Sequence, residues 1–331
     1  MEKEEIVKPV LLHYFITNRC NAACTFCSIW KDLPKTDARA NDVMANLVAA
    51  KEAGCSFVDF TGGEPLLHND LPLFLREAKR LRFITSVTTN CICFPERALE
   101  LGGLVDLLHF SLDADSEALH NRLRGSDSFD KVMESIPAAL SNNLAPDILF
   151  TYTNDNINSF AGVYELARKN KLMVILDPVF SLDGKDTVTR ETHRAALAWA
   201  RKPGVYLNRA HVKLRFMGGN KQGANYCRAV SAAIVILPEN RLALPCFHHA
   251  AEVFPIEGSL KNALASPQRL DATRYQGRYP FCEGCHINCY FDPSYCFSPS
   301  SLCFSSLLAK SSYAFMKYAV YRRKVPVKFF G

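Results

Sequence analysis

The sequence predicts an α/β fold of parallel βαβ units, followed by a smaller unit that is organised differently. Short apolar runs alternate with helically spaced stretches from about residue 10 to residue 200. This alternation stops near residue 205, and cysteines then become dense. A chain of 331 residues can hold a barrel-type domain of about 200–250 residues with an appended unit.

Six strands and six helices are expected in the first part of the chain. Apolar runs predict strands at residues 10–17, 56–60, 83–89, 104–112, 147–153 and 172–180. Helical spacing predicts helices at residues 39–53, 70–81, 95–101, 128–141, 156–170 and 189–201. Six such units fit a partial barrel or a doubly wound sheet, and periodicity alone does not choose between the two.

Composition and charge exclude several protein classes. The net charge of +6 is a mild excess, so we expect no nucleic-acid binding. The first residues are charged and mixed in sign, and no run of 18 apolar residues follows, so we expect a cytoplasmic protein with neither secretory signal nor membrane span. In a reducing compartment the 13 cysteines are better explained as metal ligands than as disulfides.

Three cysteines, Cys20, Cys24 and Cys27, fall within eight residues directly after the first predicted strand. A structural zinc site needs four ligands, and disulfides need pairs. Three thiolates on a four-iron–four-sulfur cluster leave one iron free to bind a substrate or cofactor. A zinc knuckle or three buried thiols are the alternatives.

At these residues the chain resembles the radical S-adenosylmethionine (SAM) superfamily, whose signature is Cys-x-x-x-Cys-x-aromatic-Cys with Phe26 at the aromatic position. The resemblance implies a partial (β/α)6 barrel and a [4Fe–4S] cluster whose open iron is chelated by SAM. It further implies reductive cleavage of SAM to a 5′-deoxyadenosyl radical, which abstracts a hydrogen atom from the substrate.

Further cofactor-binding residues are expected at the ends of the second and third strands. Gly62, Gly63 and Glu64 belong to the stretch "TGGEP", which resembles the family's motif beside the SAM amino group. Two glycines would let backbone groups approach a ligand, although a plain βα turn is the alternative. Asn90, in "TTN", would also lie near the cofactor.

The fourth strand ends in "SLD", where Ser111 and Asp113 share one face. A hydroxyl and a carboxylate suit the ribose hydroxyls of SAM, and a helix N-cap is the alternative. Arg124 is a candidate partner for the SAM carboxylate, or else a surface arginine. Cys91 and Cys93 follow the third strand, where a thiol could donate a hydrogen atom to a substrate radical, or could simply pack in a loop.

The later cysteines resemble the auxiliary-cluster domains called SPASM and twitch. The stretch "AIVILPENRLALPC" predicts a β-hairpin in which Asn240 is the residue suited to a left-handed turn. The spacing departs from the full SPASM pattern, so we predict one auxiliary [4Fe–4S] cluster. The predicted ligands are Cys227, Cys246, Cys282 and Cys285, with Cys289 as the next candidate. Structural zinc is the alternative.

The end of the chain predicts an amphipathic helix over residues 303–320 and a basic terminus. One side of this helix would carry Phe304, Leu307, Leu308, Phe315 and Tyr318, with Lys310 and Lys317 opposite. Arg322, Arg323, Lys324 and Lys328 form the basic end. The helix would either dock on the barrel or contact an anionic membrane surface.

These predictions divide the chain into a radical SAM barrel at 8–204, a SPASM/twitch-like unit at 205–298 and a basic tail at 299–331. We expect hydrogen abstraction from a small-molecule or lipid-like substrate, because a first strand near residue 10 leaves no room for an N-terminal peptide-binding domain. A peptide-modifying enzyme and a non-catalytic iron–sulfur electron carrier are the alternatives. A flavodoxin or ferredoxin is the expected electron donor.

Overall fold

The computed structural model describes residues 8–32, 34–297 and 300–321. Its strands are β1 Leu11–Thr17, β2 Phe57–Gly62, β3 Ile84–Thr89, β4 Leu107–Ser111, β5 Asp147–Tyr152, β6 Val174–Pro178, β7 Val205–Tyr206, β8 Ala233–Leu237, β9 Arg241–Leu244 and β10 Glu252–Pro255. Its α-helices are α1 Ile29–Asp32, α2 Ala40–Ala53, α3 Leu71–Arg80, α4 Phe94–Leu101, α5 Glu117–Arg124, α6 Phe129–Ser141, α7 Phe160–Lys169, α8 Arg190–Trp199, α9 Arg209–Phe216, α10 Ala229–Ala232, α11 Leu260–Leu264, α12 Pro267–Tyr275, α13 Asn288–Ser294 and α14 Ser301–Ala314.

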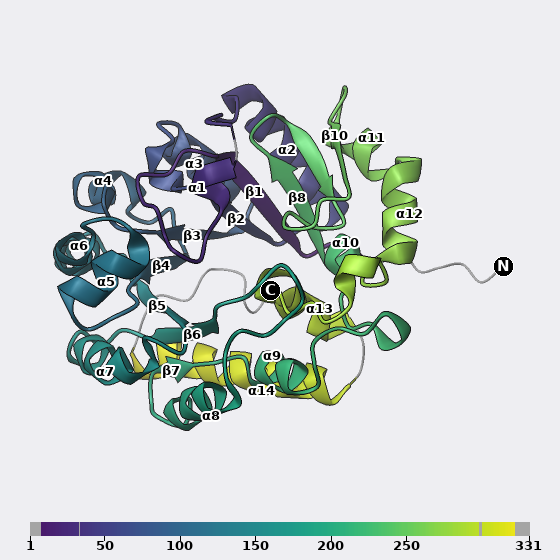
Figure 1. Ribbon diagram of the computed structural model, residues 1–331. Helices are drawn as coiled ribbons and strands as arrows, with labels where there is room; N and C mark the ends of the chain where they lie inside the picture. The colour runs from purple at the N-terminus through teal and green to yellow at the C-terminus, as the bar shows by residue number, and fades with distance from the viewer. Residues whose placement is uncertain (1–7, 33, 298–299, 322–331) are drawn as a thin grey trace.

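The strands form one sheet in the order β10-β9-β8-β1-β2-β3-β4-β5-β6-β7. From β1 to β7 each strand is parallel to the next one along the chain. A doubly wound sheet would reverse its strand order at a switch point, and this sheet does not. The strands curve round with helices on the outside (Figure 1), so the partial-barrel expectation is confirmed.

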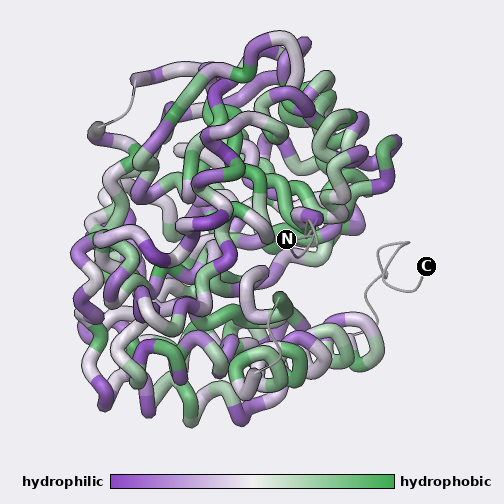
Figure 2. Tube along the Cα trace, turned by 90° about the vertical axis from the view of Figure 1, so that its right-hand side faces the viewer, coloured by the Kyte–Doolittle hydropathy of each residue, from purple (hydrophilic) through white to green (hydrophobic). Residues whose placement is uncertain are grey.

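Alternation along the strands separates an outer core from the barrel interior. On β1, Leu12, Tyr14 and Ile16 are fully buried in the main hydrophobic cluster beneath the helices. His13 and Phe15 point to the other side, where Phe15 belongs to a separate cluster. In Figure 2 the hydrophobic, green segments run through the sheet, and hydrophilic segments concentrate on the outer turns. The carboxyl ends of β1–β6 therefore open onto one edge of a rigid scaffold.

The part after residue 205 is more regular than the sequence indicated. The predicted β-hairpin is confirmed, because β8 and β9 pair antiparallel. In addition, β8 pairs in parallel with β1, with Ala233 opposite Leu11, and β10 continues the sheet. The barrel sheet and the cysteine-rich region are thus joined by backbone hydrogen bonds. The pairing of β8 with β1 was not predicted, because each strand is short and because the partner of β8 lies more than 200 residues away in the sequence.

The C-terminal helix does not dock by its apolar side. Helix α14 continues as a π-helical segment, Phe315–Val320, close to the predicted end of the helix. Lys317, which we expected opposite the apolar side, is buried and lies 2.6 Å from Asp147 at the start of β5. The basic residues Arg322, Arg323, Lys324 and Lys328 lie outside the described residues.

Candidate functional site

The loop that carries Cys20, Cys24 and Cys27 follows β1 at the carboxyl edge of the sheet. The three thiols are close enough to influence one another. Burial raises the pKa of Cys20 to about 11, and the neighbouring Glu64, Cys24 and Cys27 raise it further against a backbone hydrogen bond. A cluster of thiols that resists ionisation in water is stabilised as thiolates when positive metal ions are bound.

The two glycines after β2 hold this loop by close backbone contact. Gly63 and Glu64 donate backbone hydrogen bonds of 2.8 Å to the carbonyls of Thr17 and Arg19. A Cβ atom on Gly62 would lie 2.0 Å from the Thr17 carbonyl oxygen, and one on Gly63 would lie 2.1 Å from that of Arg19. We predicted that the glycines make room for a ligand, and the structure shows that they make room for the start of the cysteine loop.

Glu64 joins the end of β2 to the end of β3. Its carboxylate accepts hydrogen bonds from the Leu66 and Asn90 backbone amides and from the Thr89 hydroxyl. Burial raises the pKa of Glu64 to about 7 in spite of these donors. The Asn90 side chain then donates to Asn21 Oδ1 at 2.8 Å, so the predicted "TTN" motif contacts the cysteine loop directly.

The other side of the loop rests on α5, a helix that the sequence analysis missed. Backbone amides of Ala23 and Thr25 donate to the Arg124 and Leu123 carbonyls. Gly125 ends this helix in a left-handed conformation, and a Cβ there would meet the Ala23 carbonyl oxygen at 2.3 Å. The stretch "LHNRLRG", with a terminal glycine after two arginines, is the signal that would have found it.

Arg124 and Asp113 form a buried ion pair beside the loop. Arg124 Nε lies 2.6 Å from Asp113 Oδ2, Nη1 lies 3.8 Å from Cys24 Sγ, and the guanidinium lies over the Phe26 ring at 5.4 Å. Buried Nη2 has no hydrogen-bond partner among the described residues. Arg124 is buried, so it is not a surface arginine. An unsatisfied guanidinium nitrogen beside the Cys24 thiol suits an anionic ligand such as a carboxylate.

The other predicted residues near the loop lie in different surroundings. Ser111 is buried at the end of β4, while Asp113 is fully buried and its Oδ1 accepts from the Thr151 amide. Cys91 is fully buried in the main hydrophobic cluster, and its role as a hydrogen-atom donor stays a prediction. Cys93 is half-buried and accepts from Asn21 at 3.5 Å, beside the cysteine loop.

Four later cysteines lie around one pocket. Cys227, Cys246, Cys282 and Cys285 line it, with contributions from the segment after β9, from α10 and from the segment before α13. Cys289 does not line it. Cys289 is instead exposed, in the first turn of α13. The hairpin turn has Asn240 at a φ of 55°, as the sequence predicted.

Asn220 organises this pocket, and the sequence gave no signal for it. The residue is fully buried. Its side-chain amide donates to the Gly277 and Cys282 carbonyls at 2.7 and 3.1 Å, and its side-chain oxygen accepts from the Tyr226 and Cys227 amides. Its backbone amide donates to the Cys285 carbonyl. One asparagine thus connects the segment that carries Cys227 with the segment that carries Cys282 and Cys285.

Among the residues that the structure describes, no group of three His, Cys, Asp or Glu side chains is placed to hold one metal ion. The choice between an iron–sulfur cluster and a zinc ion stays a prediction.

Comparison with known proteins agrees with this geometry. Residues 14–167 match the family model of the radical SAM superfamily. This part of the chain is a radical SAM domain. The matched residues make up a little under half of the chain, and the family that they match implies a [4Fe–4S] cluster and SAM as cofactors.

Curated relatives match over less than half of the chain. A probable GTP 3′,8-cyclase of Saccharolobus islandicus is 34% identical over 139 residues, which are 41% of this chain and 45% of that protein. A probable GTP 3′,8-cyclase of Halobacterium salinarum is 33% identical over 141 residues, which are 40% of this chain and 39% of that protein. The matches thus span less than half the length of these relatives.

Solved structures match over nearly the whole chain at low identity. Streptococcus suis SuiB bound to its precursor peptide SuiA gives a TM-score of 0.68 at 16% identity, covering 90% of this chain and 76% of SuiB. The protein anSMEcpe with bound AdoMet gives a TM-score of 0.62 at 14% identity, covering 95% of this chain and 99% of anSMEcpe. At such identities these matches describe the fold.

Proposed function

We propose that this chain cleaves SAM reductively and abstracts a hydrogen atom from a small-molecule or lipid-like substrate. The observation that carries the proposal is the three-cysteine loop, which the backbones of β2 and α5 and the side chain of Asn90 hold in place beside a buried arginine. When bound, the cluster and SAM supply the radical that attacks the substrate.

The roles of the surrounding residues belong to this proposal. Cys20, Cys24 and Cys27 would hold the cluster, and Arg124 would bind the SAM carboxylate while Asp113 fixes the orientation of the guanidinium. Ser111 keeps its proposed contact with the ribose. Phe26, Gly62, Gly63, Glu64 and Asn90 support the loop, and the barrel interior excludes water from the reaction.

The test is anaerobic reconstitution with iron, sulfide, SAM and a chemical reductant, with 5′-deoxyadenosine measured by mass spectrometry. We expect production by the wild type and none by Cys24→Ala, because two thiolates do not hold a cluster with one open iron. Cys303→Ala is the matched control and should keep the wild-type rate. Normal production by Cys24→Ala would refute the proposal.

The later region would form the auxiliary unit of the chain. We place the barrel at 8–204, the twitch-like unit at 205–298 and the tail at 299–331, with one auxiliary cluster on Cys227, Cys246, Cys282 and Cys285. An acidic flavodoxin or ferredoxin would deliver the electron. The match to SuiB, whose structure holds a precursor peptide, keeps peptide modification as the second candidate function.

Peripheral membrane contact is the last part of the proposal. No described helix has both the length and the apolar character that a membrane crossing needs. Helix α14 nevertheless turns large apolar side chains to solvent, including Phe304 at 65% exposure and Phe315 at 63%. Flotation with anionic vesicles should recover the full chain and lose a chain truncated after Cys303. Equal recovery of the two would remove membrane contact.

A further inference from the structure

Helix α14 exposes large apolar side chains and buries polar ones, which is the reverse of an ordinary surface helix. Its solvent side carries Phe304, Leu307, Leu308 and Phe315, which are 47–65% exposed. Its protein side buries Leu302 but also the polar Ser306 and, one turn beyond the helix, the charged Lys317. The exposed residues repeat at helical spacing, so they form one continuous stripe. A stripe of this kind on a soluble surface indicates a contact with an apolar partner.

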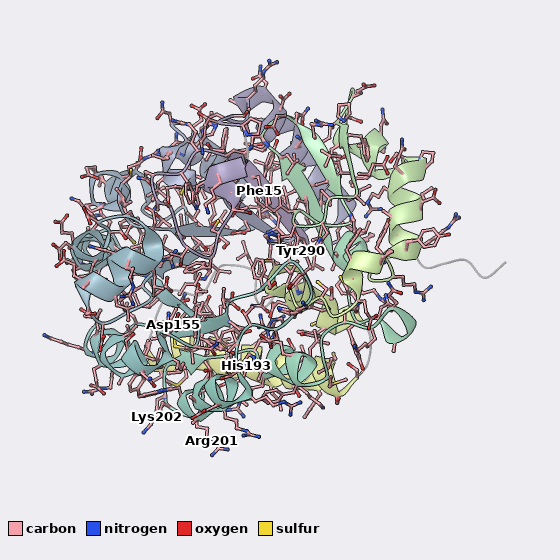
Figure 3. All side chains as sticks on the ribbon, viewed as in Figure 1. Phe15, Asp155, His193, Arg201, Lys202 and Tyr290 are labelled. Carbon is pink, nitrogen blue, oxygen red and sulfur yellow. The ribbon has the colours of Figure 1, made fainter. Side chains whose placement is uncertain are left out.

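A groove runs beside this stripe. It encloses about 600 Å³ between α14 and the segment that links α8 through β7 to α9. Leu308, Met316 and Met173 supply the apolar wall, and Arg201, Lys202 and Arg209 supply cations. None of the described residues that line the groove carries a carboxylate. Figure 3 shows Arg201 and Lys202 projecting from the edge of the molecule below α8.

The three cations are available for a ligand. Arg201, Lys202 and Arg209 are all exposed, and no ion pair involves them in the described part of the chain. Arg209 donates only to the Ala200 carbonyl at 3.2 Å, which holds it along the rim. Lys310 on α14 is different, because it is paired with Asp292 at 2.9 Å. The groove therefore has an unbalanced positive rim above an apolar wall.

The groove also borders the barrel interior. Tyr206 and Leu207 line both the groove and an inner cavity that contains His109, Asp177 and Asn288. The Tyr206 ring packs edge-on against Tyr313 of α14 at 5.3 Å. A single layer of side chains thus separates a surface groove from a polar cavity inside the barrel.

We infer that this groove binds an anionic phospholipid, with the headgroup phosphate on Arg201, Lys202 and Arg209 and an acyl chain along Leu308 and Met316. The inference rests on the proposed membrane contact and gives it a binding site. Apolar wall and cationic rim match the two ends of such a lipid, and the exposed stripe matches the bilayer that delivers it. A free phosphate would use only the rim.

The first experiment uses a lipid without a bilayer. Dihexanoyl phosphatidylglycerol, as a monomer, is titrated into the full chain by calorimetry, with dihexanoyl phosphatidylcholine and inorganic phosphate as separate arms. We expect the wild type to bind the anionic lipid and neither of the other two probes. Tight binding of inorganic phosphate equal to that of the lipid would overturn the inference in favour of a simple anion site.

Charge-reversal variants then locate the site. Arg201→Glu, Lys202→Glu and Arg209→Glu together should lose binding of the monomeric lipid and partition at least about a hundredfold less onto phosphatidylglycerol vesicles. Arg76→Glu, Arg122→Glu and Lys185→Glu change the net charge equally on other surfaces and should keep monomer binding. Equal lipid binding by the two triple variants would show that the lipid does not bind in this groove.

A tail variant separates this inference from the membrane proposal. Arg322→Glu, Arg323→Glu and Lys324→Glu together should weaken vesicle partition but leave binding of the monomeric lipid unchanged. If the wild type binds the monomeric lipid but does not float with vesicles, the lipid site in the groove is supported and the membrane proposal fails. If the wild type floats with vesicles but does not bind the monomeric lipid, the membrane proposal is supported and the lipid site in the groove fails.

Discussion

The two groups of cysteines in this molecule are built in opposite ways. The first takes three thiols from one loop of eight residues, and neighbouring strands and a helix hold the backbone of that loop. The second takes four thiols from segments spread over residues 227–285, and one buried asparagine connects the segments of three of them, Cys227, Cys282 and Cys285. The first is a local motif on a rigid frame, while the second exists only when the chain has folded.

This difference explains which group can respond to its surroundings. Glycines without room for a methyl group fix the first loop, so its geometry depends on backbone contacts that few substitutions leave intact. The second pocket depends on side-chain hydrogen bonds, each of which contributes about 1 kcal/mol. We therefore expect changes in the first group to act as all-or-none effects on SAM cleavage, and changes in the second to act gradually through stability.

The largest effect should come from Gly63→Ala. The new methyl group would lie 2.1 Å from the Arg19 carbonyl oxygen, so the start of the cysteine loop would have to move. We expect loss of 5′-deoxyadenosine production and of the iron held by the first loop, measured after reconstitution. Gly223→Ala is the control, because a Cβ there meets no atom within 4 Å. A variant Gly63→Ala with wild-type activity would show that the loop is not held by this contact.

Iron content should distinguish the two groups directly. If each holds a four-iron cluster, the wild type binds about eight irons. The variant with Cys20, Cys24 and Cys27 all changed to Ala should keep about four, and so should the Cys282→Ala/Cys285→Ala variant. Cys296→Ala should not lower the content, since Cys296 does not line the pocket. Zinc without iron in the first of these variants would show that the auxiliary unit is a zinc site.

The same contrast determined what the sequence could predict. The first six strands and their helices follow from periodicity, because each is a run of adjacent residues, and the three-cysteine motif is equally local. The parallel pairing of β8 with β1 and the support of the loop by α5 were missed, because they join distant segments. The four predicted cysteines line one pocket, and their role as cluster ligands stays a prediction. Asn220 could not be predicted, since a single buried asparagine has no sequence pattern.

A smaller effect is expected from Asn220→Ala. The substitution removes four hydrogen bonds inside the protein, which predicts destabilisation by about 3 kcal/mol. Urea denaturation of the metal-free protein should measure this loss, and reconstitution should show lower iron in the auxiliary pocket with unchanged iron in the first loop. The exposed Asn262→Ala is the control. Equal loss of iron from both groups would mean that the two are not independent.

The smallest expected effect is a loss of folding stability at acid pH, and it comes from a carboxylate beside the auxiliary pocket. Asp186 Oδ1 accepts from Arg215 Nη1 at 2.7 Å, and Oδ2 lies 2.9 Å from His193 Nε2. Burial alone would raise the pKa of Asp186, but the hydrogen bond to His193 and the charge of Arg215 lower it to about 2 from the ordinary 3.8. A lowered carboxyl pKa stabilises the fold fully above the ordinary value and loses that contribution as pH falls toward 2.

Asp186→Asn should therefore lose about 1–2 kcal/mol of unfolding free energy at neutral pH, a value reduced for the partial exposure of the carboxylate. The difference from wild type should shrink between about pH 4 and pH 2, because the wild-type carboxyl is then protonated as well. Urea denaturation of the metal-free proteins at several pH values measures it, with the exposed Asp130→Asn as the control. Arg215 also donates to the Val179 carbonyl, so the ion pair holds the end of β6 against α9. A difference between Asp186→Asn and wild type that stayed constant down to pH 2 would mean that the substitution acts through packing rather than through charge.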